Sequence, residues 1–107
     1  MIVRVPFPYT DPNTRQRRPA LVVSAGGLGP EGALLWVVLI TSAENRGWPG
    51  DVEFGASYSA AGLPAPSLIR TAKIATVEAR HVEPIGRATQ AILDRVDRQI
   101  EAALRRV

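Results

Sequence analysis

The opening stretch of the chain, residues 2–24, constrains the fold most because a polar segment joins two apolar ones. Apolar side chains recur mostly at every second position from Ile2 to Phe7, which predicts a β-strand. Pro6 and Pro8 have no N–H to donate to a neighbouring strand, so this strand is expected at an edge or at a bulge. The polar residues 9–17 predict a loop, and the apolar run at 20–23 predicts a second, buried strand.

Further apolar segments follow, separated by stretches that contain Gly and Pro. The longest, ALLWVVLIT at residues 33–41, predicts a central strand with the side chain of Trp36 in the core. A polar loop is expected after it. The remaining segments with strand character are 51–54, 67–78, which could form one long strand or two, and 80–86.

The apolar period changes near the end of the chain. Ile92, Val96, Ile100 and Leu104 follow one another at intervals of four residues, which is one face of an α-helix. Thr89 is a residue type that caps helix N-termini. We therefore expect a helix that begins near Thr89 and buries this apolar face.

Many short strands followed by a single helix exclude a parallel α/β fold, in which helices alternate with strands. A chain of 107 residues is expected to form one domain, here residues 1–107. The sequence therefore predicts a mostly β protein, a small and strongly bent barrel with a C-terminal α-helix packed on it.

The composition excludes several kinds of catalytic site. The chain has no Cys, so disulfides, thiolate metal sites and Cys nucleophiles are excluded. His81 is the only His, which excludes a pair of histidines acting as acid and base within one chain. The acidic residues are scattered without the spacing of metal ligands, so neither a metal nor another cofactor is expected.

The sequence gives no sign of a membrane segment. No apolar run approaches the roughly 20 residues of a membrane span. Prolines interrupt the N-terminal stretch where a signal peptide would be continuously apolar. We therefore expect a soluble cytoplasmic protein with no membrane partner.

The charge favours a nucleic acid as partner. The formal net charge is +3, and all thirteen basic residues except Lys73 are Arg, whose planar fork matches phosphate. A genome rich in G and C would enrich Arg equally well. The placement is more informative, because Arg15, Arg17 and Arg18 gather where a loop meets the start of a strand. A strand that fixes an adjacent arginine in this way suits the binding of a phosphate group.

Five segments, in this order along the chain, carry a resemblance to a known family. They are VPFPYTD at 5–11, RRPALVVS at 17–24, LITS at 39–42, AGLPAPS at 61–67 and RTAKIATV at 70–77. Together they resemble the MazF/PemK family of toxins from type II toxin–antitoxin pairs. The resemblance implies an SH3-like barrel with a C-terminal α-helix.

The resemblance also implies an activity and a set of partners. Members of the family are ribosome-independent endoribonucleases, or mRNA interferases, that cut single-stranded mRNA. A homodimer is implied, with RNA in the groove between the two copies. A cognate antitoxin is implied as well, with a flexible tail in that groove, and DNA would be contacted only through the antitoxin.

The resemblance places the catalytic machinery at Arg18 and Thr41, with Arg70 in support. Arg18 would stabilise the extra negative charge of a pentacoordinate phosphorane, and the hydroxyl of Thr41 would donate to a phosphate oxygen or orient the 2′-OH. Each residue also has a simpler role open to it: Arg18 could be a solvated loop residue, and Thr41 an ordinary strand residue. Arg70 could instead form an ion pair, and its candidate partners are Asp51, Glu53 and Glu78.

Further residues are expected to contact the RNA rather than to take part in cleavage. Trp48 could stack on a base, or it could equally cap the barrel. The full set expected to bind RNA is Arg15, Arg17, Ser42, Arg46, Trp48 and Lys73.

One departure from the family concerns proton transfer. Many members carry an acid where this chain has Ala72, so the sequence leaves the general base open.

We expect a metal-independent, sequence-specific cleavage that yields a 2′,3′-cyclic phosphate and a 5′-hydroxyl. The rival functions are a gyrase-poisoning toxin of the same fold and a catalytically weak RNA-binding module, which Ala72 motivates.

Overall fold

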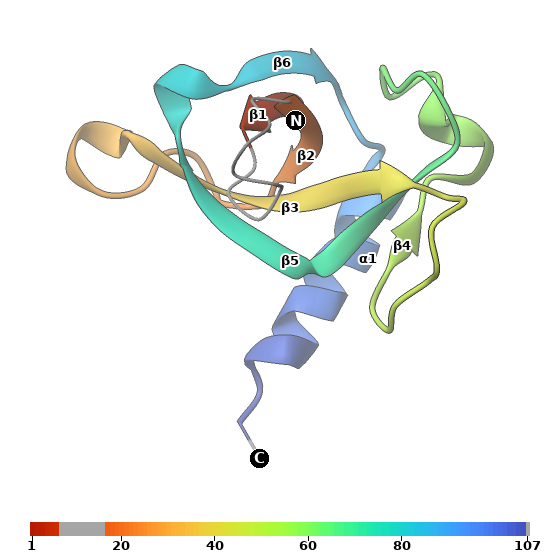
Figure 1. Cartoon of the computed structure of the whole chain (residues 1–107). Helices are drawn as coiled ribbons and strands as arrows, with labels where there is room; N and C mark the ends of the chain where they lie inside the picture. Colours follow the sequence, from red (N-terminus) through yellow and green to blue (C-terminus); the bar gives the residue numbers. More distant parts are fainter. Residues whose placement is uncertain (7–16, 107) are drawn as a thin grey trace.

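The computed structural model describes residues 1–6 and 17–106 of the chain. The predicted loop at 9–17 lies outside the described residues except for its last residue, and the site prediction for Arg15 lies outside them too. Within them, six strands form one antiparallel sheet, and a single α-helix follows (Figure 1). This is the mostly β architecture with a C-terminal helix that the sequence predicts.

The elements follow one another with short connections. In chain order they are β1 (Ile2–Pro6), β2 (Arg17–Val22), the 3₁₀ helix η1 (Pro30–Gly32), β3 (Leu34–Ser42), β4 (Val52–Glu53), the 3₁₀ helix η2 (Gly55–Tyr58), β5 (Ser67–Glu78), the 3₁₀ helix η3 (Ala79–His81), β6 (Glu83–Gly86) and α1 (Gln90–Leu104). Their order across the sheet is β4-β5-β3-β2-β1-β6. Figure 1 shows the sheet curling so that β5, η3 and β6 wrap around β1 and β2 as a barrel.

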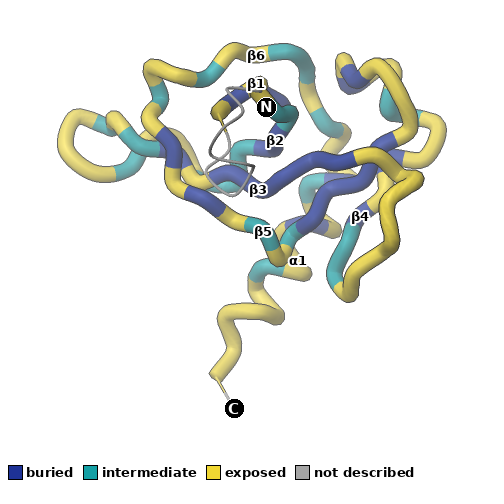
Figure 2. The backbone as a smooth tube through the Cα atoms, in the orientation of Figure 1, coloured by how far each residue is buried: buried dark blue, intermediate teal, exposed yellow. Residues whose placement is uncertain are grey.

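The strand β3 is apolar along most of its length because both of its faces are covered. Val38 and Ile40 pack on one side with Val96 of the helix. Val37 and Leu39 point to the opposite side and belong to a second apolar cluster. Figure 2 shows most of this strand as buried. The predicted central strand is therefore confirmed.

The strand β5 is a single long strand with a sharp irregularity, which settles the choice between one strand and two. Its pairing with β3 jumps from Ile74 opposite Val38 to Arg70 opposite Leu39. Residues 71–73 have no partner on β3, so they form a bulge, and a bulge bends a strand. This bend lets one strand serve two sides of the barrel.

The strand β1 is bulged but does not lie at an edge, since it runs between β2 and β6. Its pairing with β6 is irregular between Ile2 and Val3 and ends at Arg4, which lies opposite Glu83. Pro6 therefore lies beyond the part of β1 that pairs with β6, where a missing N–H costs no ladder bond on that side.

The helix α1 begins where the sequence predicts. Thr89 is its N-cap, and the backbone N–H of Ile92 donates to the Thr89 hydroxyl at 3.3 Å. Ile92 and Val96 are buried, and Ile100 is half-buried against the same cluster. No helix in residues 1–6 and 17–106 has the length and apolar character needed to cross a membrane.

Two predictions of buried side chains are wrong. Leu104 is 74% exposed, because the last turn of α1 extends past the sheet (Figure 1). Trp36 is 49% exposed. It shares a strand face with Val38, but it lies beyond the part of that face that the buried half of the helix covers.

Replacing Ile92 by Ala should lower the free energy of unfolding by about 2–5 kcal/mol, because a buried side chain of this size leaves a cavity. Denaturation in urea, followed by circular dichroism, measures the loss. Arg95→Ala, on the exposed face of the same helix, should change stability by less than about 0.5 kcal/mol. Equal losses for the two variants would show that the helix does not pack through this face.

Candidate functional site

Arg18 and Thr41 meet where β2 and β3 run side by side. The two strands are antiparallel, with Ala20 opposite Leu39. The pairing ends there, and the same register continued by two residues would set Arg18 level with Thr41. Residues opposite one another on neighbouring strands have Cβ atoms about 5 Å apart and share a face of the sheet. The sheet thus brings together the two residues that the sequence predicts as catalytic.

A cavity of about 200 Å³ lies at this point. The polar residues of its lining are Arg18 on β2, Thr41 and Ser42 on β3, and Ser67 on β5. Its apolar wall comes largely from the AGLPAPS segment that precedes β5. The lining residues are Arg18, Pro19, Ile40, Thr41, Ser42, Leu63, Pro64, Ala65, Pro66 and Ser67. Arginine and hydroxyl side chains are residue types that can donate to a phosphate group.

The AGLPAPS wall is held in place by a close backbone contact. A Cβ on Gly62 would lie 2.2 Å from the carbonyl oxygen of Ile85, and Gly62 has a φ of +87°. Only glycine tolerates both the close approach and this backbone conformation. The segment therefore rests against β6, which fixes one side of the cavity.

The hydroxyls in the cavity are themselves oriented by hydrogen bonds. The side-chain amide of Asn45 donates from Nδ2 to Oγ1 of Thr41 at 2.7 Å. Ser42 Oγ accepts from the backbone N–H of Glu44 at 3.2 Å, and Ser67 Oγ donates to the carbonyl oxygen of Ala65 at 2.8 Å. Thr41 is only 7% exposed, so its hydroxyl has little freedom to reorient.

Arg70 forms the ion pair with Asp51, one of the partners that the sequence left open. Its Nη2 lies 3.0 Å from Asp51 Oδ2 and its Nε lies 3.3 Å from Asp51 Oδ1, with both side chains 8% exposed. Nη2 also donates to the carbonyl oxygen of Arg46 at 2.7 Å, and the guanidinium lies 4.2 Å from the ring centre of Trp48. A direct contact of Arg70 with phosphate stays a prediction, and it would have to compete with these partners.

Three residues expected to bind RNA gather around this ion pair. Trp48 covers Arg70 and is still 41% exposed, and the Lys73 ammonium lies 5.4 Å from the centre of the same ring. Arg46 is exposed on the loop between β3 and β4. The ring of Trp48 covers the guanidinium of Arg70. Capping of the barrel, one of the two roles that the sequence left open, stays a prediction. Stacking of its exposed part on a base stays a prediction.

Arg17 lies apart from the cavity. Successive side chains of a strand point to opposite faces, so Arg17 and Arg18 diverge. Arg17 donates to the carbonyl oxygen of His81 and, at 3.4 Å, to that of Arg4, and it lies 3.8 Å from Glu83. These contacts join β2 to β1, η3 and β6. RNA binding by Arg17 stays a prediction that no contact with the cavity supports.

The sequence did not identify Asn45 and Ser67 as residues of the site. Ser67 lies at the end of a segment that the family resemblance had singled out, so that segment carried a signal. Asn45 lies in a polar loop without periodicity, and only the fold brings it to Thr41. In the part of the chain that the structure describes, no cluster of three His, Asp or Glu side chains could hold a metal ion.

Removing one member of the Arg70–Asp51 pair should destabilise the protein severely. Asp51→Ala should cost about 3–5 kcal/mol of unfolding free energy, because it leaves a buried guanidinium without its carboxylate. The urea midpoint measures this. Glu53→Ala, two residues away and exposed, is the matched control. The double variant Asp51→Ala/Arg70→Met should recover part of the lost unfolding free energy. A double variant less stable than both Asp51→Ala and Arg70→Met would contradict this.

Several solved structures have the same fold. The toxin MazF-mt6 of Mycobacterium tuberculosis is 18% identical, with 96% of this chain and 95% of that chain covered and a TM-score of 0.66. MazF of the MazE–MazF structure from Deinococcus radiodurans is 23% identical, with 96% and 89% covered and a TM-score of 0.68. An endoribonuclease in complex with its cognate antitoxin, from a mycobacterial species, is 18% identical, with 96% and 89% covered and a TM-score of 0.66.

These likenesses show the fold of MazF, the SH3-like barrel that the resemblance implied. The sequence matches none of the curated proteins with which it was compared. A model of the family described as "PemK-like, MazF-like toxin of type II toxin-antitoxin system" matches residues 1–104, nearly the whole chain. The chain therefore belongs to this family of toxins.

Proposed function

We propose that this toxin is an endoribonuclease that cleaves single-stranded mRNA in the cavity between β2 and β3. The observation that carries the proposal is that Arg18 and Thr41 line the same cavity. The register of β2 and β3, continued by two residues, is consistent with this. Relatives with the same fold are described as endoribonucleases. The combination of an arginine and a threonine at this position is the one expected for the family.

The chemistry follows from what each side chain can donate. The 2′-oxygen of the RNA attacks the adjacent phosphorus and loses its proton, and the bond from phosphorus to the 5′-oxygen breaks as that oxygen gains a proton. The products are a 2′,3′-cyclic phosphate and a 5′-hydroxyl. Arg18 donates two parallel hydrogen bonds to the phosphorane oxygens, and the hydroxyl of Thr41 donates a third.

Proton transfer needs a carrier other than these two residues. Arginine stays protonated in proteins, so Arg18 cannot act as a base. Ala72 is exposed on the β5 bulge and offers no carboxylate. Water or an oxygen of the RNA itself carries the protons in this proposal.

The proposed RNA path runs from the cavity toward Trp48. The loop between β3 and β4 presents the exposed Arg46 and Trp48 beside Lys73. Positive charges suit the phosphate backbone, and an exposed aromatic ring suits stacking on an unpaired base. Sequence preference would arise from such contacts.

The partner of this toxin is proposed to be a cognate antitoxin in the cytoplasm, where mRNA is available. MazF from Deinococcus radiodurans is described together with MazE, and a mycobacterial endoribonuclease together with its cognate antitoxin. A flexible antitoxin tail would block cleavage by occupying the RNA path.

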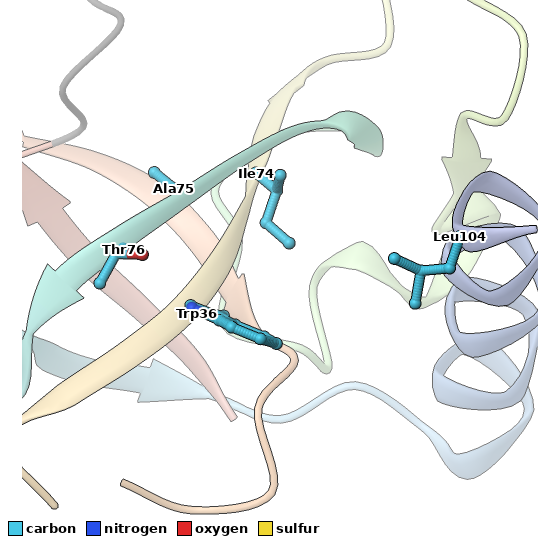
Figure 3. Close-up of a pocket in the computed structure, with 5 residues that line it drawn as sticks. All are labelled: Trp36, Ile74, Ala75, Thr76 and Leu104. Atoms are coloured by element: carbon cyan, nitrogen blue, oxygen red, sulfur yellow. The ribbon is translucent and has the colours of Figure 1, made fainter. Parts of the chain in front are cut away.

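A homodimer is proposed on the basis of an exposed apolar patch. Figure 3 shows Trp36 and Ile74 on neighbouring strands, with Leu104 facing them from the end of α1. These side chains are 49%, 41% and 74% exposed, and they line a pocket of about 310 Å³. Contiguous exposed apolar side chains mark interaction sites, and a second copy of this chain would cover them.

One experiment separates this function from its rivals. Purified protein is incubated with a long RNA in the presence of EDTA, and the ends of any fragments are mapped. Cleavage with 5′-hydroxyl ends supports the proposal, whereas binding without cleavage supports the weak RNA-binding module. If the protein neither cleaves nor binds the RNA but inhibits gyrase, the result supports the gyrase-poisoning toxin. Each sample is therefore also run without EDTA, and cleavage that occurs only without EDTA would overturn the metal-independent mechanism.

Arg18→Ala should slow cleavage more than a hundredfold, which corresponds to about 3 kcal/mol of lost transition-state stabilisation. Arg18→Lys should recover little, because a point charge cannot donate two parallel hydrogen bonds. Thr41→Ala should also slow cleavage severely, while Thr41→Ser should retain part of the rate. Single-turnover assays measure these rates, and RNA affinity should fall less than the rate does. Near wild-type rates for both alanine variants would contradict the mechanism.

Trp36→Lys should convert the proposed dimer into a monomer, because it places a charge at the centre of the apolar patch. Sedimentation at micromolar concentration should show the wild-type protein at twice the mass of the 11.5 kDa chain. The control Glu53→Lys is exposed and outside the patch, and it should leave the mass unchanged. A wild-type protein that sediments only as a monomer would refute the assembly.

A further inference from the structure

We propose that Asn45 is a positioning residue that sets the direction of the Thr41 hydroxyl and thereby makes it a donor to the RNA phosphate. This inference rests on the proposed cleavage at Arg18 and Thr41. It concerns a residue whose side chain lines no part of the cavity and acts through another group.

The polarity of the hydrogen bond carries the inference. Asn45 Nδ2 donates to Thr41 Oγ1 at 2.7 Å, so the threonine oxygen is the acceptor in this bond. A hydroxyl has one proton to donate and two lone pairs that accept. With one lone pair held by Asn45, the proton of Thr41 is left to point elsewhere, and Thr41 lines the cavity. A phosphate oxygen there would receive it.

Asn45 is held in place by its own loop. The backbone N–H of Asn45 donates to the carbonyl oxygen of Ser42 at 3.1 Å, and that of Ala43 donates to the carbonyl oxygen of Pro66 at 3.0 Å. At the far end, the hydroxyl of Thr71 donates to the carbonyl oxygen of Gly50 at 2.7 Å. The backbone that carries Asn45 is thus pinned on both sides, and the bond to Thr41 holds its amide before any RNA binds.

Arg70 holds the next residue of the loop, Arg46. Its Nη2 donates to the carbonyl oxygen of Arg46, the residue that follows Asn45. The ion pair with Asp51 fixes the guanidinium that makes this contact. Arg70 therefore supports cleavage through the loop, in a way that requires no contact with the phosphate.

Two variants of Asn45 and one of its neighbour Glu44 test the direction of the hydrogen bond between Asn45 and Thr41. Asn45→Ala removes the donor, and the cleavage rate should fall roughly tenfold, the value of one hydrogen bond. Asn45→Asp has nearly the same shape, but an ionised carboxylate only accepts, so it should take the threonine proton away from the phosphate. It should cleave more slowly than Asn45→Ala. Glu44→Ala is the control, because it is the adjacent exposed residue of the same loop.

The readouts are kcat and KM on a long RNA, with the thermal unfolding midpoint of each variant. The inference predicts lower kcat for both Asn45 variants, KM within about twofold of wild type, and wild-type behaviour for Glu44→Ala. A merely structural asparagine would give the opposite order, because the isosteric Asp should then be tolerated better than Ala. If the wild-type protein cleaves RNA, either that order or an unchanged rate for Asn45→Ala overturns the inference alone. A wild-type protein that cleaves no RNA overturns both the inference and the proposed function.

Discussion

The buried ion pair between Arg70 and Asp51 is the interaction on which the surroundings of Thr41 depend. Two charges that are each 8% exposed are stable there because the guanidinium has a carboxylate, a carbonyl oxygen and an aromatic ring around it. Burial of this kind fixes geometry more than it adds stability, because desolvation offsets much of the attraction. Arg70 is therefore one of the residues that hold the loop from β3 to β4, together with Pro66 and Thr71 at its two ends.

That side chain meets Asp51 because β4 pairs with β5. Val52 lies opposite Ile69, and this antiparallel register, continued by one residue, sets Asp51 level with Arg70. The β5 bulge follows directly along the strand. Three residues without partners on β3 separate Arg70 from Ile74, and the strand bends between them. A regular strand would keep pairing with β3 along a straight line and would not close the barrel. The irregularity thus lets the sheet close, and it carries the exposed Ala72.

The sequence predicts what depends on local pattern and misses what depends on closure. The apolar run of β3 and the four-residue period of α1 are local, and both elements form where they are expected, with Thr89 as the cap. Burial of Leu104 and Trp36 depends on how far the helix reaches across the sheet, which periodicity does not encode. The partner of Arg70 had three candidates in the sequence, and the pairing of β4 with β5 selects Asp51. Asn45 carried no pattern at all.

The placement of Arg18 and Thr41 shows why a small barrel can hold such a site. Both residues lie where an apolar strand meets polar surroundings, so the strands fix their positions while their polar atoms stay beside a cavity. The opposite wall of the cavity comes from the AGLPAPS segment, whose Gly62 allows a close backbone approach to β6. The core of this barrel is small. The backbone hydrogen bonds of the sheet position Arg18, and the loop between β3 and β4 orients the hydroxyl of Thr41. Preorganisation here is a property of strand ends and their loops, and it needs no further domain.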